Sequence, residues 1–531
     1  MTIRNCHVSN FGAGIRFLGT NGGLLIDSSS ATNRFGGITL EGSSGVVVRS
    51  TDAHDNGLSG FFLWRNSVGN QFSDTTSTNN RTGFFLTESD DNLFKNNMVS
   101  GNSADGVSVF GSSGNEFKNN HIHDNSGQGV SVGDSDSNIF KDNTLADNGM
   151  FGFLALNAGS NTFTRNDVSG HTDQQFHFAN GSDGNLLVAN AASGGEAGYV
   201  FLASAGNLAK DNYATAYTSG GYGISEGSSH NSLHNNVADD GLGGGHGFSI
   251  NESHHNELID NTAIGGVIGF SLDFGATDNT LKGNYAAGNS IIQFAIESSD
   301  GGSGLLRSDR NHLVNNTAEG GEIGFFLRTA SDNVLQSNTA SGASGNGFDI
   351  EGTYDGAVFL GGSDGNTLTD NSSIANGGSG FLVWDSDGNV LTANLAHDNA
   401  SGFDGASGFD VRWSDNTELS RNEATDNEGD GILVLFGDGS TITRNTTNGN
   451  TVSGVAVIFV ADTDVKRNTS LNNNSNGFAV IATNGIGTVL SRNTACGNGD
   501  FDAVDFSGNI PLDPALWDNN GFCQDVVFQP V

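Results

Sequence analysis

A short asparagine pattern recurs along almost the whole chain and limits its possible folds more than any other feature. The pattern is Asn, any residue, Phe or Leu, two residues, Asn, and its clearest copies begin at Asn92, Asn115, Asn138 and Asn161, 23 residues apart. The second Asn of the pattern returns as far as Asn493. Self-similarity at a fixed period of roughly 20–50 residues is the signature of a repeat protein. The chain is therefore expected to stack one small structural unit many times.

Each repeat is expected to consist of β-strands and turns. Gly, an apolar residue, any residue and a second apolar residue occur in the same register, as in 83–86, 106–109 and 380–383. Apolar residues two apart are typical of strands. The Gly, Asn, Ser and Asp residues between them tolerate the left-handed backbone of sharp corners. No segment shows helical periodicity.

Successive repeats must stack, because one short strand cannot bury its apolar face alone. Coils of this length favour a right-handed parallel β-helix, since left-handed ones show strict six-residue periods and parallel crossovers prefer the right hand. The prediction is a single all-β solenoid of about 21 coils over residues 1–493 with a C-terminal cap at 494–531. The repeated Asn should form a ladder that satisfies buried turn backbone.

These repeats resemble the right-handed parallel β-helix repeats of the pectin-lyase-like superfamily, from Ile3 to about Asn493. The resemblance implies polysaccharide lyases, polygalacturonase-type hydrolases, alginate epimerases, phage tailspikes or NosD-like periplasmic proteins, so function must be argued from the outer surface. Of the catalytic motifs, only 239–240 (Asp-Asp) and 245–247 (Gly-His-Gly) match a polygalacturonase, weakly. The Asp-Pro step at 513–514 lacks the His of an epimerase.

The charge of the chain excludes several partners. Lys and Arg number 21 against 59 Asp and Glu, a net charge of −38, which repels nucleic acid phosphates and acidic membranes. No window approaches the apolar length of a membrane span, so no membrane insertion is expected. The first residues carry no signal-peptide pattern. Thr2–Val8 already resembles the middle of a coil, so we expect either preceding sequence or contact with another chain at this end.

Charged and aromatic residues that should face outwards gather in the coils between Asp273 and Arg412. Three insertions, near 298–310, 352–364 and 398–407, interrupt the regular spacing there. Loops on a rigid scaffold are where binding residues are usually found, and flat aromatic faces stack on sugar rings. The prediction is a polysaccharide-binding groove, with these substrate-binding candidates: Asp273, Glu297, Tyr354, Trp384 and Trp413.

If the groove is catalytic, the candidates are Asp349, Glu351, Asp410, Arg328 and Arg412. Carboxylates on neighbouring coils, roughly 7–10 Å apart, suit an inverting hydrolase. A lyase or epimerase would instead use an arginine beside a carboxylate-held calcium ion, which makes Ca²⁺ a candidate cofactor. The alternatives are a non-catalytic surface or adhesive solenoid, or a NosD-like periplasmic binding protein.

Histidine pairs and cysteines complete the sequence evidence. The histidine pairs, such as His121 and His123, are interpreted as surface residues in turns because no Cys or Met accompanies them. Cys496 and Cys523 are 27 residues apart, close to one coil, so we predict a disulfide between them and a free Cys6. A disulfide implies an oxidising compartment, here extracellular or periplasmic.

Overall fold

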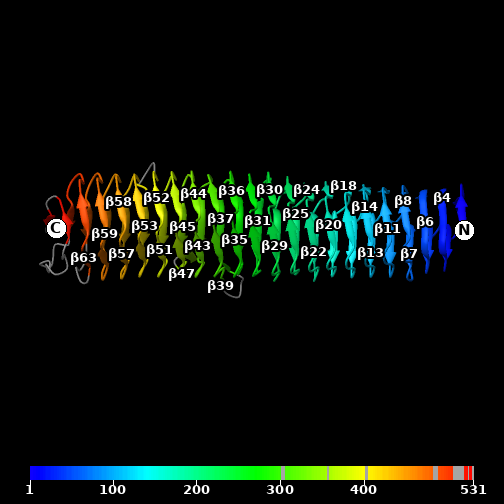
Figure 1. Cartoon of the computed structure of the whole chain (residues 1–531), viewed down its shortest axis with the longest axis horizontal. Helices are drawn as coiled ribbons and strands as arrows, with labels where there is room; N and C mark the ends of the chain where they lie inside the picture. The colour runs from blue at the N-terminus through cyan, green and yellow to red at the C-terminus, as the bar shows by residue number, and fades with distance from the viewer. Residues whose placement is uncertain are drawn as a thin grey trace. The chain divides into compact units, whose positions relative to one another are not determined.

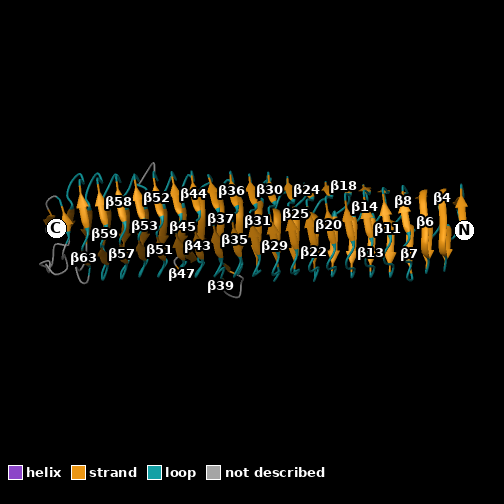
Figure 2. Ribbon diagram, viewed as in Figure 1, coloured by secondary structure: helices purple, strands orange, loops and turns teal. Residues whose placement is uncertain are grey.

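The computed structural model describes residues 1–300, 305–355, 358–400, 405–481, 488–505, 520–523 and 526–528. All regular elements in these ranges are β-strands, with turns between them (Figure 1, Figure 2). No described helix is long and apolar enough to cross a membrane. The chain divides into unit 1, Met1–Ser249, and unit 2, Ile250–Val531. Both are β-solenoids with about 21 turns in total, which confirms the predicted fold class.

A typical coil contributes one strand to each of three rows. In unit 1, β13 (Val107–Phe110) belongs to row 1, β14 (Glu116–Lys118) to row 2 and β15 (His121–His123) to row 3. Each pairs in parallel with its copy one coil on, β16 (Val130–Gly133), β17 (Ile139–Lys141) and β18 (Thr144–Ala146). The three rows arise because each short strand finds its hydrogen-bond partners only in neighbouring coils.

The strands of row 1 carry most of the surface features described below. In unit 1 they are β3 (Ile15–Leu18), β5 (Ile38–Glu41), β7 (Ser59–Trp64) and β10 (Thr82–Thr87). In unit 2 they are β37 (Ile292–Glu297), β42 (Ile323–Arg328), β45 (Phe348–Glu351), β50 (Phe381–Trp384), β53 (Phe409–Arg412), β56 (Ile432–Leu435), β59 (Val455–Ile458) and β62 (Phe478–Ile481).

Columns of stacked phenylalanines fill the interior of both units. In unit 2 the ring of Phe348 lies 4.7 Å from that of Phe325 and 4.6 Å from that of Phe381, with the ring planes nearly parallel. These side chains are fully buried. Parallel in-register pairing places the same repeat position directly above itself, so a Phe conserved from coil to coil becomes a stack.

The predicted asparagine ladder is confirmed, and Asn143 shows its chemistry. The backbone N–H of Asn143 donates to Oδ1 of Asn166 in the next coil at 3.1 Å, and its amide donates to the same oxygen and to the carbonyl of Phe117, each at 2.9 Å. Asn143 in turn accepts two hydrogen bonds from Asn120. Two further ladders, through Asn115 and Asn125, have the same geometry. Buried corners therefore keep their backbone groups paired.

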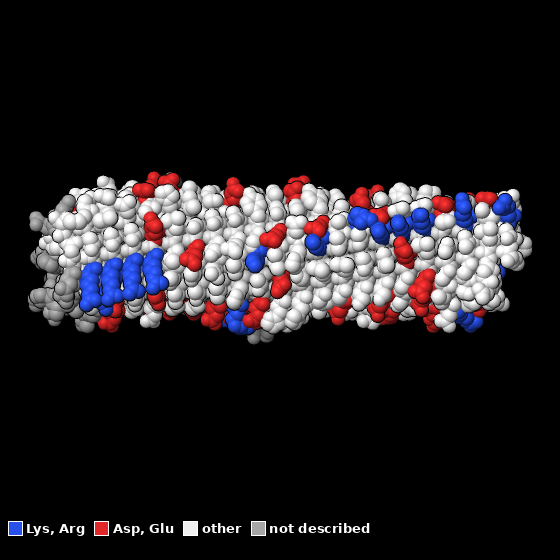
Figure 3. All heavy atoms as spheres, viewed as in Figure 1, with Lys and Arg blue, Asp and Glu red and all other residues white. Residues whose placement is uncertain are grey.

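Two corners of many coils use a left-handed backbone. The first corner follows the row 1 strand, as at Asp134 (φ 46°), and the second follows the row 2 strand, as at Asn119 (φ 53°). Asn, Asp and Gly adopt positive φ with little strain, whereas bulky residues are disfavoured there. Basic residues follow one another on neighbouring coils in places and form short rows on the face in Figure 3. A bulky residue at a corner is thus a feature to explain.

The C-terminal strands continue the solenoid rows. In row 3, β64 (Thr494–Cys496) pairs with β61 (Thr469–Leu471), and in row 1, β65 (Ala503–Asp505) pairs with β62. Cys496 and Cys523 form a disulfide with Cα atoms 5.1 Å apart, and Cys6 is free. The boundary at residue 493 stays a prediction, because most of the expected cap, 506–519 with its prolines and Trp517, lies outside the described residues.

Candidate functional site

Three predicted site residues, Glu297, Arg328 and Glu351, lie in register on neighbouring row 1 strands of unit 2. The guanidinium of Arg328 donates to Glu297 at 2.9 Å and lies 5.4 Å from the ring centre of Phe326. Burial raises the pKa of both glutamate carboxyls, while Arg328 opposes the shift. The prediction that these residues are neighbours is met, and they form a half-buried charged row.

Asp349 is a buried carboxyl with an incomplete set of partners. It lies in register between Phe326 and Leu382 and is only 6% exposed. The amide of Asn346 donates to its Oδ2 at 2.9 Å, whereas its Oδ1 is buried with no hydrogen-bond partner among the described residues. Burial raises the pKa of Asp349 to about 7. A large share of this carboxyl is therefore protonated at neutral pH.

Asp410 is buried in a different way, under its own arginine. Two nitrogens of Arg412, Nε and Nη2, donate to the two carboxylate oxygens at 2.7 Å each, and Ser379 lies 3.4 Å from Oδ2. Such a two-pronged pair is among the stronger charge-assisted contacts. A hollow of about 200 Å³ opens beside it, lined by Asn346, Ser379, Leu382, Trp384, Asp410 and Arg412 together with Gly378, Gly405 and Ala406.

The expectation that the lane of Asp349 and Asp410 faces solvent is wrong for these two residues. Both point out of the coil, but bulky neighbours on adjacent coils flank Asp349, and the guanidinium of Arg412 folds over Asp410, which is 2% exposed. Two strand steps separate these carboxyls, roughly 10 Å. Alternation along a strand gives the direction of a side chain but not what its neighbours cover.

The predicted aromatic residues of unit 2 belong to a longer exposed row. Trp384 stacks on Trp413 at 5.8 Å between ring centres, Trp413 on Phe436 at 5.5 Å, and Phe436 on Phe459 at 5.2 Å. Their exposed fractions are 42, 45, 41 and 38%. We call these four residues the aromatic row. Phe436 and Phe459 escaped the sequence analysis, although each follows its predecessor by 23 residues.

The two remaining candidates of unit 2 lie near the insertions. Tyr354, exposed, donates from its hydroxyl to Asp385 at 2.9 Å, directly after Trp384 in the sequence. Asp273 accepts from the Ser299 hydroxyl at 2.6 Å. Tyr354 is thus tied to the coil that carries Trp384, whereas no printed contact joins Asp273 to the aromatic row within the described residues.

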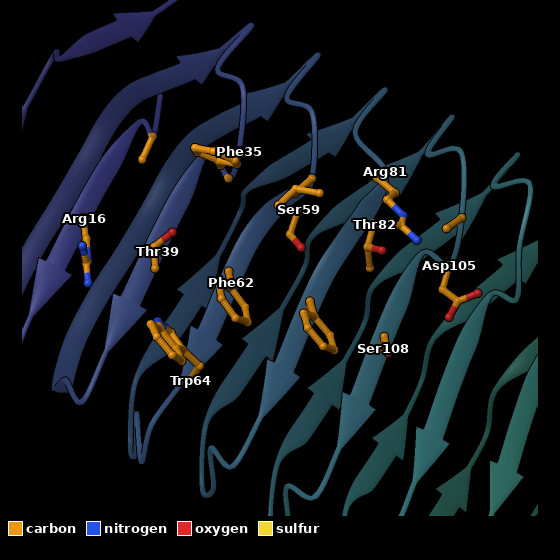
Figure 4. Close-up of a pocket in the computed structure, with 15 residues that line it drawn as sticks. Arg16, Phe35, Thr39, Ser59, Phe62, Trp64, Arg81, Thr82, Asp105 and Ser108 are labelled. Atoms are coloured by element: carbon orange, nitrogen blue, oxygen red, sulfur yellow. The ribbon is translucent and has the colours of Figure 1, made fainter. Parts of the chain in front are cut away.

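Unit 1 holds a larger groove, about 590 Å³, that the sequence analysis did not find (Figure 4). Its floor is aromatic, with Phe62 stacked on Phe85 at 5.3 Å and on Trp64 at 5.7 Å. Arg16 lies at one end and Arg81 and Asp105 at the other. The recurrence of Phe at 62 and 85 is the signal that could have revealed this groove.

Charged side chains support the Trp64 end of this groove. Arg65 lies 4.1 Å from the Trp64 ring centre and donates to Glu41 at 2.7 Å, and Glu41 also pairs with Arg16. At the other end, burial raises the pKa of Asp105, while a backbone N–H from Gln128 partly offsets the shift. The groove thus combines flat apolar faces with polar groups at both ends, as sugar-binding surfaces do.

Metal-binding chemistry is sparse in the described part of the chain. No group of three or more His, Cys, Asp or Glu there is arranged to hold a metal ion, so no calcium site can be assigned from these residues. The strongest set is His121 and His123, with ring centres 4.4 Å apart, beside Met98, the register partner of His121 on β12 (Met98–Ser100). The expectation that no Met accompanies the histidines is therefore wrong at this pair.

The donors of this set suit a soft transition metal. Two imidazoles and a thioether are ligands that copper takes in proteins. Nδ1 of His123 lies 2.7 Å from Asp124 Oδ2, which leaves Nε2 available, a common second-shell arrangement. Burial, then the neighbouring His123, lowers the pKa of His121 and favours its neutral, ligating form. Met98, His121 and His123 are thus the residues that would hold such an ion.

Comparison with known proteins gives the family. The family model described as periplasmic copper-binding protein (NosD) matches residues 29–192, 155–298 and 285–405, and the model described as right handed beta helix region matches 349–495. No curated protein matches the chain.

Solved structures resemble the chain at low identity. The A-module of Azotobacter vinelandii mannuronan C-5 epimerase AlgE4 is 13% identical and covers 63% of this chain and 91% of its own, with a TM-score of 0.31. A tailspike protein of E. coli bacteriophage HK620, in complex with a pentasaccharide, is 10% identical and covers 87% and 72%, with a TM-score of 0.32. These likenesses concern the fold alone. Because its family model matches well over half of the sequence, the chain belongs to the periplasmic copper-binding protein (NosD) family of right-handed β-helices.

Proposed function

We propose that this protein, exported to the periplasm or the cell exterior, binds a polysaccharide along the aromatic row of unit 2. The observation that carries the proposal is the row itself: four exposed, stacked rings on successive coils. Sugar rings stack on such faces through their C–H groups. An extended polysaccharide that runs from coil to coil can place one sugar on each ring.

The backbone of the row supports a functional explanation. Trp413, Phe436 and Phe459 occupy first corners with φ of 48°, 56° and 54°. A bulky residue in this region costs free energy that Asn, Asp or Gly would avoid. Three consecutive coils keep an aromatic residue there even though each ring is exposed to water. A binding surface explains this cost, because neither packing nor backbone preference does.

A double variant tests the proposal. Trp413→Asn with Phe436→Asn removes two rings and places at both corners a residue that prefers positive φ, so the fold should survive. At about 0.5–1.5 kcal/mol for each stacked ring, affinity for a glycan identified on an array should fall about 5- to 150-fold. Phe274→Asn is the matched control, because Phe274 is 40% exposed at a first corner with φ of 51° and has no printed stacking partner.

Either of two results would refute this function. One is a wild-type protein that retains no member of a broad glycan panel. The other is a double variant that binds the retained glycan as tightly as Phe274→Asn does. Trp64→Ala, in the groove of unit 1, is measured in parallel and reports whether that groove holds the same glycan.

Cleavage of the bound glycan is a finer proposal. The environments of two predicted catalytic residues differ as those of an acid and a base do: burial raises the pKa of Asp349 to about 7, and Arg412 holds the carboxylate of Asp410. Glu351 and Arg328 flank Asp349 in the charged row. Catalysis would require Arg412 to swing off Asp410. Release of reducing ends or unsaturated products, lost in Asp349→Asn and Asp410→Asn, is the test, and an inactive wild type argues for binding alone.

Copper binding is a second candidate function, favoured by the family description and by the donor set in unit 1. Met98, His121 and His123 would bind the ion, as neutral imidazoles and a thioether. The expected result is about one copper ion per chain by elemental analysis after dialysis, lost in the His121→Ala, His123→Ala double variant. The same change at His254 and His255, whose ring centres are 5.2 Å apart, serves as the control. Equal copper content in both variants would rule this site out.

A further inference from the structure

Four arginines occupy the second corner of four successive coils in unit 2. They are Arg421, Arg444, Arg467 and Arg492, which follow β54 (Glu418–Ser420), β57 (Thr441–Thr443), β60 (Asp464–Lys466) and β63 (Val489–Ser491). All four are exposed. They form a compact row of basic side chains near the C-terminal end of the face in Figure 3. We call them the arginine row.

The arginine row is unfavourable for the protein on two counts. Its φ angles are 59°, 59°, 60° and 58°, where a branchless small polar residue would suffice, as Asn119 does at the same corner in unit 1. Like charges also stack at one strand spacing, about 4.8 Å. Both costs would vanish with Asn at the corner, so the row calls for an explanation other than stability.

Other arginines at corners are neutralised within the protein. Arg165, at a second corner in unit 1, donates twice to Asp142 of the preceding coil, at 2.8 and 3.1 Å. Arg310 does the same to Asp278. Among the described residues, by contrast, no carboxylate forms an ion pair with a guanidinium of the arginine row. Its neighbour Lys466 is already paired with Asp464 at 2.7 Å.

A groove of about 500 Å³ lies beside the row. It is lined by Thr443, Arg444, Lys466, Arg467, Val489, Ser491 and Arg492. Three guanidiniums therefore share one groove with hydroxyl groups from the adjacent row 2 strands. Guanidinium pairs bidentately with carboxylate and sulfate, and hydroxyls accept and donate to sugar oxygens.

We propose that the arginine row is a binding site for a linear acidic polysaccharide, with one carboxylate or sulfate group held at each coil. A straight row at a strand spacing close to the length of one pyranose suits an extended sugar chain. Phosphates of a nucleic acid duplex instead follow a helical path, with a rise of about 3.4 Å per step, and the net charge of −38 opposes them. This site is separate from the aromatic row and does not depend on it.

The test compares two triple variants of the full chain that lose the same charge. Arg444→Asn, Arg467→Asn and Arg492→Asn remove the row and relieve the corners, so the thermal midpoint should stay or rise. The control is Lys95→Asn, Lys118→Asn and Lys141→Asn, which removes a register row of lysines on the row 2 strands of unit 1. The probes are labelled polygalacturonate, dextran sulfate and neutral dextran, measured by fluorescence anisotropy at about 50 mM and about 200 mM salt.

We expect the arginine variant to bind the better acidic probe about 10- to 100-fold more weakly, and the lysine variant to bind it within about 2-fold of wild type. Whether polygalacturonate or dextran sulfate binds more tightly identifies the anionic group. An equal loss in both variants would mean attraction by charge alone and would overturn the proposal, as would tighter binding of a single-stranded DNA of equal charge. Trp413→Asn with Phe436→Asn, run alongside, separates failure here from failure of the aromatic row.

Discussion

Replacing Asp349 with Asn should abolish a loss of stability that burial imposes on the native protein at neutral and alkaline pH. Burial raises the pKa of this carboxyl from 3.8 to about 7. One pKa unit corresponds to about 1.4 kcal/mol, so ionising Asp349 inside the coil costs about 4 kcal/mol relative to the unfolded chain. The missing hydrogen bond at Oδ1 is consistent with a cost of this size.

The sign follows from which state holds the proton. Between about pH 4 and pH 7 the native Asp349 keeps a proton that the unfolded chain has released, so its contribution to the free energy of unfolding falls as pH rises and levels off above pH 7. Asn at this position mimics the protonated acid and does not titrate. The variant should match wild type near pH 4 and exceed it by up to about 4 kcal/mol at pH 8.

Urea denaturation at pH 4.5 and pH 8, followed by tryptophan fluorescence, measures this difference. Other carboxyls titrate in both proteins, so subtracting the two curves isolates position 349. Asp398→Asn controls for lost charge, because Asp398 is exposed at a corner with φ of 56°. If the advantage of Asp349→Asn is the same at both pH values within about 1 kcal/mol, the pKa argument is wrong.

Two further predictions concern the scaffold. Titration of the unfolded protein without reductant should find one free thiol, Cys6, and Cys496→Ser should lower the free energy of unfolding by about 3 kcal/mol; three free thiols would remove the bridge. Asn143→Ala should leave a backbone N–H, an amide and a carbonyl of neighbouring coils unpaired, at a cost of at least about 3 kcal/mol by thermal or urea unfolding, whereas a loss below about 1 kcal/mol would show that water replaces the ladder.

The sequence predicted what the repeat period controls. Asparagines 23 residues apart had to stack, and the ladder through Asn143 follows from that spacing and from the need to pair corner backbone. The same arithmetic would have placed Met98 beside His121 and Phe436 beside Trp413, because each pair is also 23 residues apart. These neighbours were overlooked although the information was present.

Burial at the site could not be predicted in this way. Asp349 is covered because Phe326 and Leu382 stand on either side of it, and Asp410 because Arg412 adopts the one rotamer that turns back along its own strand. Such cover depends on side-chain torsions, on which the repeat period has no influence. The groove at Phe62 was missed for a similar reason, since its depth comes from the side chains around it.

The positive-φ corners also give the solenoid a means of measuring its ligand. Duplication of one coil would add one more copy of the corner, in register, while the asparagine ladder closed around the insertion. The four corners from Arg421 to Arg492 span three such increments, about 14 Å, so a chain of four charged sugars fills them and a shorter one leaves a whole corner empty. Affinity should therefore rise in discrete steps with oligomer length up to four units and change little beyond, so that the number of consecutive identical corners acts as a ruler.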